Sequence, residues 1–332
     1  MTAQEEKRAE VQQAILGWYR EGNRELPWRH TRDSYAILVS EIMLQQTQVD
    51  RVLPKFHEFL GLYPTLKVLA AAPRAEVIRN WSPLGYNMRA VRLHEIARQA
   101  VERFGGRLPE TLEGLLSLKG IGRYTAAAVM CFAYGAPEAV LDTNVRRVLG
   151  RIFAEEAPTA LEDDRVAWAL AEDVLPNDAP ESAYDWNQAL MDLGATVCVS
   201  RVPRCLVCPA QRWCSAWKLW YGGEVVVQEG LPLVAERKAS YVVSRSNGAK
   251  RVAKKAEPFE GSRRWYRGRI VDALRKLPPG DDLDLGGLRA ALSERSAAVD
   301  EAKLYEIVLA LVKDGLVTMR GEGVEMRVRL PE

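Results

Sequence analysis

Hydrophobic residues recur every three or four positions through most of the first 220 residues, as Val11, Ile15 and Tyr19 do near the start. This period is typical of amphipathic helices, and the alternating runs typical of strands are nearly absent there. The pattern predicts helices over 74–80, 88–103, 111–118, 123–134, 143–153, 164–174 and 183–194, separated by breakers rich in Gly and Pro. The first two thirds of the chain is therefore expected to be α-helical.

A further, partly apolar helical stripe contains Leu38, Ile42, Gln45 and Val49, and it predicts a helix through these positions. Glu41 lies inside this stripe. A partly buried carboxylic acid holds its proton to higher pH, which suits a general acid. The alternative, an exposed helix charge, is less attractive because apolar side chains surround the position.

After about residue 260 the pattern changes. Helices are predicted over 264–276, 285–294 and 301–314, followed by strands over Leu316–Arg320 and Val324–Leu330. Three helices and a hairpin are the order of a winged helix. Such modules bind either DNA or other proteins, so the partner of this one stays open.

The segment between these regions is strongly basic. Eleven cationic residues face two glutamates over 237–269: Arg237, Lys238, Arg245, Lys250, Arg251, Lys254, Lys255, Arg263, Arg264, Arg267 and Arg269. The charge is either a solvated face or, beside a nucleic-acid enzyme, a phosphate-binding segment. We expect a helical region over 1–225, a basic linker over 226–262 and a winged-helix-like domain over 263–332.

Composition narrows the class of protein. The 332 residues are enough for about two domains, and 48% hydrophobic with 27% charged residues is typical of a soluble globular chain. A disordered tail, a collagen and a membrane channel are excluded. With no run of 18 apolar residues and no signal-like start, we expect a cytoplasmic, nucleoid-associated monomer without a membrane partner. The net charge of +2 says little about partners.

Four of the five cysteines are clustered, with the spacing C-x6-C-x2-C-x5-C: Cys198, Cys205, Cys208 and Cys214. Disulfides are disfavoured in a reducing compartment. Structural zinc favours two CxxC pairs, whereas this loop has one. Four thiolates in one compact loop suit a [4Fe–4S] cluster. Cys131 lies in an apolar run and is expected in the core.

Two further segments have residue types suited to DNA chemistry. Gly120-Ile121-Gly122 joins two predicted helices, and glycines there allow backbone amides at a helix N-terminus to bind a phosphate. A tight turn between helices is the simpler alternative. Asp142 and Asn144 stand at or before the next helix start, where an aspartate also serves as an N-cap.

Several motifs together resemble the helix-hairpin-helix DNA glycosylases of the endonuclease III superfamily, and most closely the MutY adenine glycosylases. They are LPWR (26–29), SEIMLQQTQV (40–49), LKGIGRYTA (118–126), LDTNVRRV (141–148), WNQALMDLGATVC (186–198) and the cysteine loop. The resemblance covers about residues 10–220. It implies a six-helix barrel domain plus an iron–sulfur cluster domain, and double-stranded DNA with a damaged or mispaired purine as the partner.

The resemblance also implies roles for individual residues. Glu41 would protonate the flipped purine at N7, Asp142 would stabilise the oxocarbenium-like sugar, Asn144 would orient these acids and Tyr124 would line the site. The base pocket would contain Arg24, Leu26, Trp28, Gln188 and Met191. The DNA contacts would come from Arg29, Gln45, Gln46, Asn87, Gly120, Gly122 and Arg123.

Tyr124 separates the branches of this family. Lyases of the endonuclease III type have at this position a lysine that forms a Schiff base. The tyrosine here therefore implies a monofunctional glycosylase that leaves an abasic site. The neighbouring residues also look like those of thymine-mismatch glycosylases, so a thymine or uracil mismatch glycosylase is an alternative. A non-catalytic iron–sulfur DNA-binding protein is another.

Two departures from the MutY pattern bear on the target base. The C-terminal region looks like a winged helix where MutY proteins usually have a Nudix-like domain. Asn87 stands where the family's Gly-Leu-Gly-Tyr-Tyr stretch has its second tyrosine. The resemblance implies that the ring of this tyrosine wedges beside 8-oxoguanine. Without a reader of the opposite base, the excised base itself should be abnormal. Hypoxanthine is therefore slightly favoured over adenine mispaired with 8-oxoguanine or G.

Overall fold

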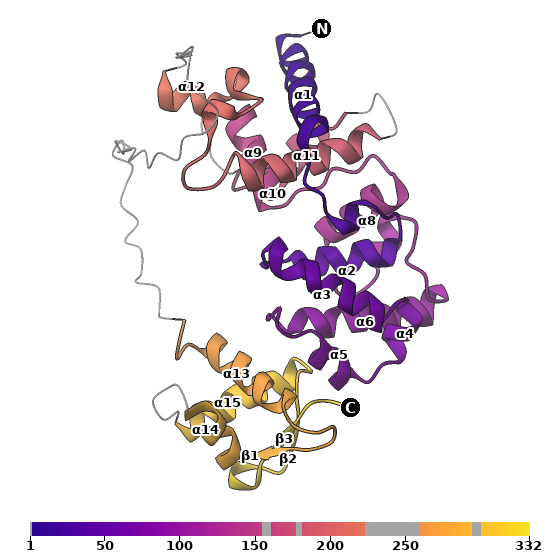
Figure 1. Cartoon of the computed structure of the whole chain (residues 1–332), viewed down its shortest axis with the longest axis vertical. Coiled ribbons are helices and arrows are strands. Elements are labelled where there is room, and N and C mark those ends of the chain that lie inside the picture. The colour runs from indigo at the N-terminus through magenta and orange to yellow at the C-terminus, as the bar shows by residue number, and fades with distance from the viewer. Residues whose placement is uncertain (1, 155–160, 177–180, 223–258, 294–299) are drawn as a thin grey trace.

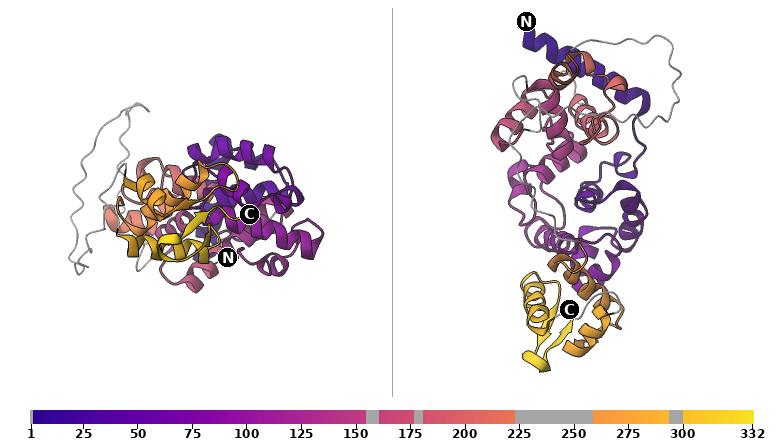
Figure 2. Two further views of the ribbon diagram at one scale, coloured as in Figure 1. Left: turned by 90° about the horizontal axis from the view of Figure 1, so that it is seen from below. Right: turned by 90° about the vertical axis from the view of Figure 1, so that its left-hand side faces the viewer.

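The computed structural model describes residues 2–154, 161–176, 181–222, 259–293 and 300–332. Its helices form three groups that follow one another along the long axis of the molecule (Figure 1). The N-terminus lies in one outer group, and the C-terminus lies in the other (Figure 2). Most of the expected basic linker lies outside the described residues, and so do the first seven of the eleven cationic residues over 237–269.

The first group combines the N-terminal helix with helices from much later in the chain. It contains α1 (Ala3–Gly22), α9 (Thr143–Phe153), α10 (Asp164–Asp173), α11 (Ser182–Thr196) and α12 (Ser215–Tyr221). Thr2 and Glu5 form a capping box that begins α1. The buried face of α1 packs on α11, so segments far apart in sequence lie side by side (Figure 1).

The second group lies between the outer two. After the short 3₁₀ turn Pro27–Arg29 it contains α2 (Ser34–Leu44), α3 (Val49–Leu62), α4 (Leu66–Ala71), α5 (Arg74–Asn80), α6 (Met88–Phe104), α7 (Leu112–Leu116) and α8 (Arg123–Tyr134). Every residue of α2 from Tyr35 to Met43 is buried. A helix that is apolar on all sides is a central helix. The burial of Glu41 follows from this position.

The helix bounds agree closely with the helical period of the sequence, since α5, α8 and α9 begin and end as expected. The stripe through residue 49 is an exception. The α2 helix ends at Leu44, and α3 begins at Val49 after a loop in which Gln46 has a φ of 57°. A non-glycine residue in this left-handed region cannot continue a right-handed helix.

The third group is the C-terminal domain, which has its own core. It contains α13 (Arg263–Arg275), β1 (Leu283–Asp284), α14 (Leu285–Ser293), α15 (Glu301–Lys313), β2 (Thr318–Arg320) and β3 (Arg327–Arg329). The sheet is antiparallel with the order β1-β3-β2, and Val328 pairs with both Leu283 and Met319. The strand β1 was not expected, because two residues are too few to show an alternation. Within the described residues, no helix is long and apolar enough to cross a membrane.

The C-terminal domain packs directly against the second group. Ile78 of α5 is fully buried within the domain's core, and Ala75, Met88 and Val91 contact the same cluster. The Arg275 guanidinium donates to the Ile78 carbonyl, with Nη2 and O 2.8 Å apart. The domain is therefore held by apolar burial together with a polar contact.

Candidate active site

Glu41 lies in the last turn of α2, where only 5% of its surface is exposed. The Tyr124 hydroxyl, in the first turn of α8, donates a 2.6 Å hydrogen bond to Glu41 Oε2. Burial raises the pKa of Glu41 to about 7; the hydrogen bond from Tyr124 opposes this shift, and the negative charge of Asp142 adds to it. A carboxyl group that titrates near neutral pH is suited to donate a proton.

Asp142 and Asn144 are held in a chain of hydrogen bonds at the start of α9. Asp142 Oδ1 accepts the backbone N–H of Val145 as an N-cap, and its Oδ2 accepts from Asn144 Nδ2 at 3.0 Å. Arg147 Nη2 donates to Asn144 Oδ1 at 2.9 Å. A Cβ on Gly194 would lie 2.7 Å from the Asn144 Cβ, so glycine is required for this approach of α11. Asp142 is thus fixed in place, near enough to Glu41 for its charge to raise the pKa of that carboxyl group.

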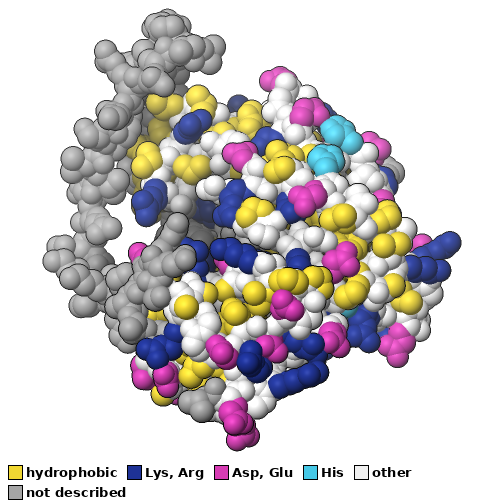
Figure 3. Space-filling view, turned by 60° about the horizontal axis from the view of Figure 1, so that its bottom comes forward, with side chains coloured by type: hydrophobic (Ala, Val, Ile, Leu, Met, Phe, Trp, Pro, Cys, Tyr) yellow, Lys and Arg dark blue, Asp and Glu magenta, His cyan; other side chains and the backbone are white. Residues whose placement is uncertain are grey.

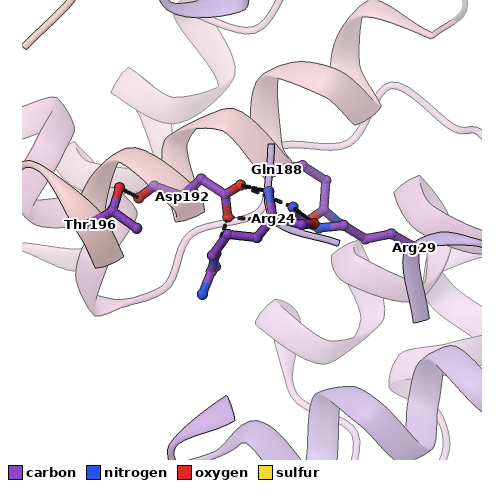
Figure 4. A network of polar contacts seen from close by, with 5 residues as sticks. All are labelled: Arg24, Arg29, Gln188, Asp192 and Thr196. Carbon is purple, nitrogen blue, oxygen red and sulfur yellow. Dashed lines mark hydrogen bonds and ion pairs between the residues drawn. The ribbon is translucent and has the colours of Figure 1, made fainter. Parts of the chain in front are cut away.

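The expected base-pocket residues Arg24 and Gln188 belong to one network (Figure 4). Asp192, which is 1% exposed, accepts from Arg24 Nε at 2.6 Å and from both terminal nitrogens of Arg29, at 2.7 and 3.0 Å. Arg29 Nε donates to Gln188 Oε1 at 2.8 Å. The network therefore bonds the segment after α1 to α11.

Asp192 was missed in the sequence, although it lies one helical turn after Gln188 on the same face of α11. Burial alone would raise the pKa of Asp192, but the hydrogen bonds and charge of Arg29 outweigh burial and hold it below its usual value. Burial alone would lower the pKa of Arg29, and Asp192 raises it instead. The ionised forms of Arg29 and Asp192 therefore stabilise each other in this buried position.

The position of Arg29 corrects the expectation that it contacts DNA. Its side chain is 6% exposed and all of its described polar contacts are internal. Trp28 is also interior, with its ring edge-on to Phe56. Leu26 is buried, whereas Met191 is half-buried and Arg24 is partly exposed. Arg29 thus supports Gln188 from within the protein.

The Gly-x-Gly turn before α8 has the geometry expected of a phosphate site. Gly120 has a φ of 111°, and a Cβ there would lie 2.7 Å from the Arg92 Cγ. Gly122 is the N-cap, and no side chain caps the first turn of α8. Uncapped amides at a helix N-terminus favour an anion. Arg123 is exposed, stacks on Trp168 and pairs with Glu172.

The loop after α2 and the loop before α6 are joined by Arg89, which is 5% exposed. Its guanidinium donates to the carbonyls of Met43 and Gln45 at 2.6 and 2.5 Å, and to the Gly85 carbonyl at 3.2 Å. These acceptors include last-turn carbonyls that α2 leaves unpaired. Sequence reasoning missed Arg89, because an arginine on an amphipathic helix is usually solvated.

Gln46 and Tyr86 are the two non-glycine residues with positive φ in the described part of the chain, at 57° and 47°. Such strain costs about 1–3 kcal/mol and persists where the surroundings impose it. Both residues are exposed, whereas Gln45 is half-buried. The strained Gln46 lies in the loop that directly follows α2, about one helical turn after Glu41.

Asn87 does not have the exposed position expected of a DNA contact. It is 9% exposed, and its Oδ1 accepts from Arg275 Nη2 of the C-terminal domain at 2.7 Å. The neighbouring Tyr86 is 37% exposed instead. The exposed ring of this loop is therefore Tyr86, and Asn87 belongs to the contact between domains.

The four clustered cysteines line a single cavity, together with Arg151, Trp217 and other side chains. All are free thiols. Arg151 Nη1 donates to Cys198 Sγ at 3.4 Å, and the Cys214 thiol donates to the Arg151 carbonyl at 3.3 Å. Burial raises the pKa of Cys208 to about 12. In the described ranges, no three His, Cys, Asp or Glu side chains are grouped around a single ion position.

Charge on the molecular surface is uneven. Figure 3 shows Lys and Arg side chains bordering a hollow near the middle of the face it displays. A hollow bordered by cations concentrates polyanions such as DNA.

Comparison with known proteins agrees with this geometry. Residues 39–172 match the family described as HhH-GPD superfamily base excision DNA repair protein. The adenine DNA glycosylase of Mycolicibacterium smegmatis is 38% identical over 317 residues, covering 93% of this chain and 96% of that protein. A thymine/uracil-DNA glycosylase of Methanothermobacter thermautotrophicus is 35% identical, over 65% of this chain and 97% of its own.

Among solved structures, a thermostable thymine-DNA glycosylase superposes with a TM-score of 0.62 at 34% identity, covering 66% of this chain and all of that one. The solved thymine-DNA glycosylase therefore matches 66% of this chain, whereas the mycobacterial relative matches 93% of it. On these grounds the chain is a DNA N-glycosylase of base excision repair that belongs to the HhH-GPD superfamily, within its MutY-type adenine DNA glycosylases.

Proposed function

We propose that this glycosylase removes adenine from mispairs with 8-oxoguanine or G and leaves an abasic site. The observation that carries the proposal is the buried Glu41, with a pKa raised to about 7, bonded to Tyr124 and facing Asp142. Tyr124 occupies the place of a lyase lysine, so no amine is available there for a Schiff base. The relative of nearly equal length, which spans the C-terminal region too, is named an adenine DNA glycosylase.

In the proposed mechanism the purine nucleotide leaves the duplex and enters the site between the first and second helix groups. Glu41 donates its proton to N7, which turns the base into a leaving group. Asp142, whose carboxylate accepts the Val145 N–H and the Asn144 side-chain amide, stabilises the positive charge that develops on the sugar. Water then completes the hydrolysis at the anomeric carbon.

We further propose that the cysteine cavity holds a [4Fe–4S] cluster through Cys198, Cys205, Cys208 and Cys214. Four cysteines of one compact loop that line a single cavity fit a polynuclear cluster, and the loop has one CxxC pair where structural zinc favours two. Buried thiols with raised pKa values need a bound cation to become thiolates. When bound, the cluster would cross-link the loop to the end of α11 and supply no step of the hydrolysis. Iron and sulfide analysis after anaerobic purification tests this.

Hypoxanthine is the second candidate. Its preference in the sequence rested on two departures, the winged-helix-like C-terminal region and the loss of an aromatic ring at Asn87. Tyr86 supplies an exposed ring in the same loop as Asn87. The chemistry at N7 is the same for both purines, so Glu41 could serve either. A thymine or uracil substrate has no N7, and protonation by Glu41 gives it no comparable help.

A single-turnover glycosylase assay, with alkali to cleave abasic sites, separates these candidates. Four duplexes would contain adenine opposite 8-oxoguanine, adenine opposite G, hypoxanthine opposite T, and thymine opposite G. We expect the first to react fastest. Faster cleavage of hypoxanthine opposite T than of either adenine mispair would replace adenine as the target, and cleavage of thymine alone would overturn the proposal.

The pH dependence of excision should follow Glu41. The acid form is needed, so the wild-type rate should fall as pH rises through about 7. Tyr124→Phe removes the hydrogen bond that lowers the pKa of Glu41, so the descending limb should move to higher pH. Single-turnover rates across a pH series measure the descending limb in the wild type and in the variant. An unchanged limb in Tyr124→Phe would mean that another group titrates.

Replacing Arg89 by lysine should destabilise the protein. One ammonium cannot reach the acceptors on both loops, so we expect a loss of about 3 kcal/mol in the free energy of unfolding. Urea unfolding measures it. Arg98→Lys, at an exposed site on the same helix, is the matched control and should change stability little. Equal effects of the two substitutions would contradict the role of Arg89.

A further inference from the structure

One face of α13 contacts the loop before α6 through two arginines. Arg264 and Arg275 are eleven residues apart, which is about three helical turns, so they share this face. The Arg264 guanidinium donates to the Tyr86 hydroxyl and lies 4.3 Å from the centre of its ring. Arg275 donates to the Asn87 side chain at 2.7 Å. The C-terminal domain thus contacts two consecutive residues of this loop.

Two arginines contact Tyr86. Arg89 donates to the carbonyl of Gly85 and lies 5.4 Å from the Tyr86 ring centre. The second is Arg264, whose guanidinium also lies 5.4 Å from the exposed ring of Phe259. A tyrosine with positive φ keeps that conformation only where contacts impose it. One of the two cationic contacts comes from the C-terminal domain.

The departure from the family pattern at Asn87 is explained by the same contact. An amide oxygen accepts a guanidinium N–H directly, and Arg275 uses it together with the Ile78 carbonyl. Because Ile78 is also buried in the domain's core, the domain is docked by apolar packing at the same place. The asparagine therefore serves domain docking, and Tyr86 next to it is left to face outward.

We propose that the C-terminal domain is a positioning element for Tyr86: Arg264 fixes the ring at the mouth of the site, where it contacts the duplex beside the mispair. This inference rests on the proposed function for its substrate. Loss of Arg264 should then reduce excision where the mispair has to be opened, and should leave excision of an already unpaired adenine nearly unchanged. The domain would contribute to selectivity and not to hydrolysis.

Arg264→Ala tests this, with Arg263→Ala as the matched control, because both remove one exposed cation from the first turn of α13. Single-turnover rates are compared for adenine opposite 8-oxoguanine and adenine opposite an abasic-site analogue. We expect Arg264→Ala to lower the ratio of the two rates about tenfold, as loss of a cation–π contact and a hydrogen bond implies. Arg263→Ala should affect both substrates equally. Identical ratios in the two variants would overturn the inference.

Hydrogen exchange on the free protein gives a second readout. Amides of residues 84–88 should exchange faster in Arg264→Ala than in the wild type or in Arg263→Ala. Unchanged exchange in Arg264→Ala would overturn the positioning role whatever the substrate is. If the wild type excises no adenine but exchange responds as expected, the proposed function fails and the contact itself stands.

Discussion

Glu41→Gln should abolish excision while leaving the protein folded. Glutamine keeps an oxygen that can accept the Tyr124 hydroxyl, but it has no proton to give to the purine. General acid catalysis contributes about a hundredfold to ten-thousandfold, so we expect a loss of about a thousandfold or more in the single-turnover rate. DNA binding, measured by anisotropy with the same duplex, should be nearly unchanged. Glu102→Gln, an exposed carboxylate on α6, is the control.

Glu41→Gln should raise the stability of the protein at alkaline pH, although it abolishes activity. The folded-state pKa of Glu41 is raised from 4.5 to about 7, so the native state holds a proton that the unfolded chain releases between these values. The wild type therefore loses stability as pH rises through this window, by up to about 3 kcal/mol. Glu41→Gln does not titrate and should be the more stable protein at pH 8. A Tm below that of the wild type at pH 8 would contradict the buried-acid assignment.

Asp142→Asn should be the second most damaging substitution for activity. Asparagine is as good an N-cap as aspartate, so α9 should still begin at the same place. The negative charge next to the sugar is lost, however, and removal of one electrostatic stabiliser costs about a hundredfold to a thousandfold in rate. The single-turnover rate on adenine opposite 8-oxoguanine measures this loss.

Asp163→Asn is the matched control for this change, because Asp163 caps α10 by the same type of contact. It should leave the rate unchanged and have a similar effect on thermal stability. If Asp142→Asn retained the wild-type rate, Asp142 would be a helix cap alone. If it lost activity only in step with stability, the charge would have no separate role.

The helical period was sufficient to predict most of the fold, because burial on one side of a helix leaves a regular trace in the sequence. The helical period failed to predict the end of α2 at Leu44, because a tertiary contact determines the backbone conformation there. Arg89 donates hydrogen bonds to the Met43 and Gln45 carbonyls, and Gln46 adopts a positive φ that ends the helix. Likewise β1 pairs through only two residues, and its partner β3 is distant in sequence. The local pattern of hydrophobic residues cannot show contacts between segments that are distant in sequence.

The acids of the site were predictable from chemistry and resemblance, since Glu41 and Asp142 stand in distinctive local contexts. The residues that hold the pocket together were not. Asp192 matters because two arginines far away in sequence reach it, and Arg29 is internal for the same reason. Asn87 could not be understood without Arg275, which comes from another domain.

The bond between Arg24 and Asp192 joins positions 168 residues apart, which has a consequence for biosynthesis. Helices α2 to α8 can pack against one another once about 140 residues have emerged from the ribosome, since domains form as units during translation. Helix α1, synthesised first, has to wait for its main packing partner, α11, until much later in translation. Its apolar side, with Val11 and Ile15, stays uncovered throughout that interval. We expect nascent chains stalled between these two points to be retained by chaperones through α1, and the catalytic pocket to form only after the helices of the second group have packed.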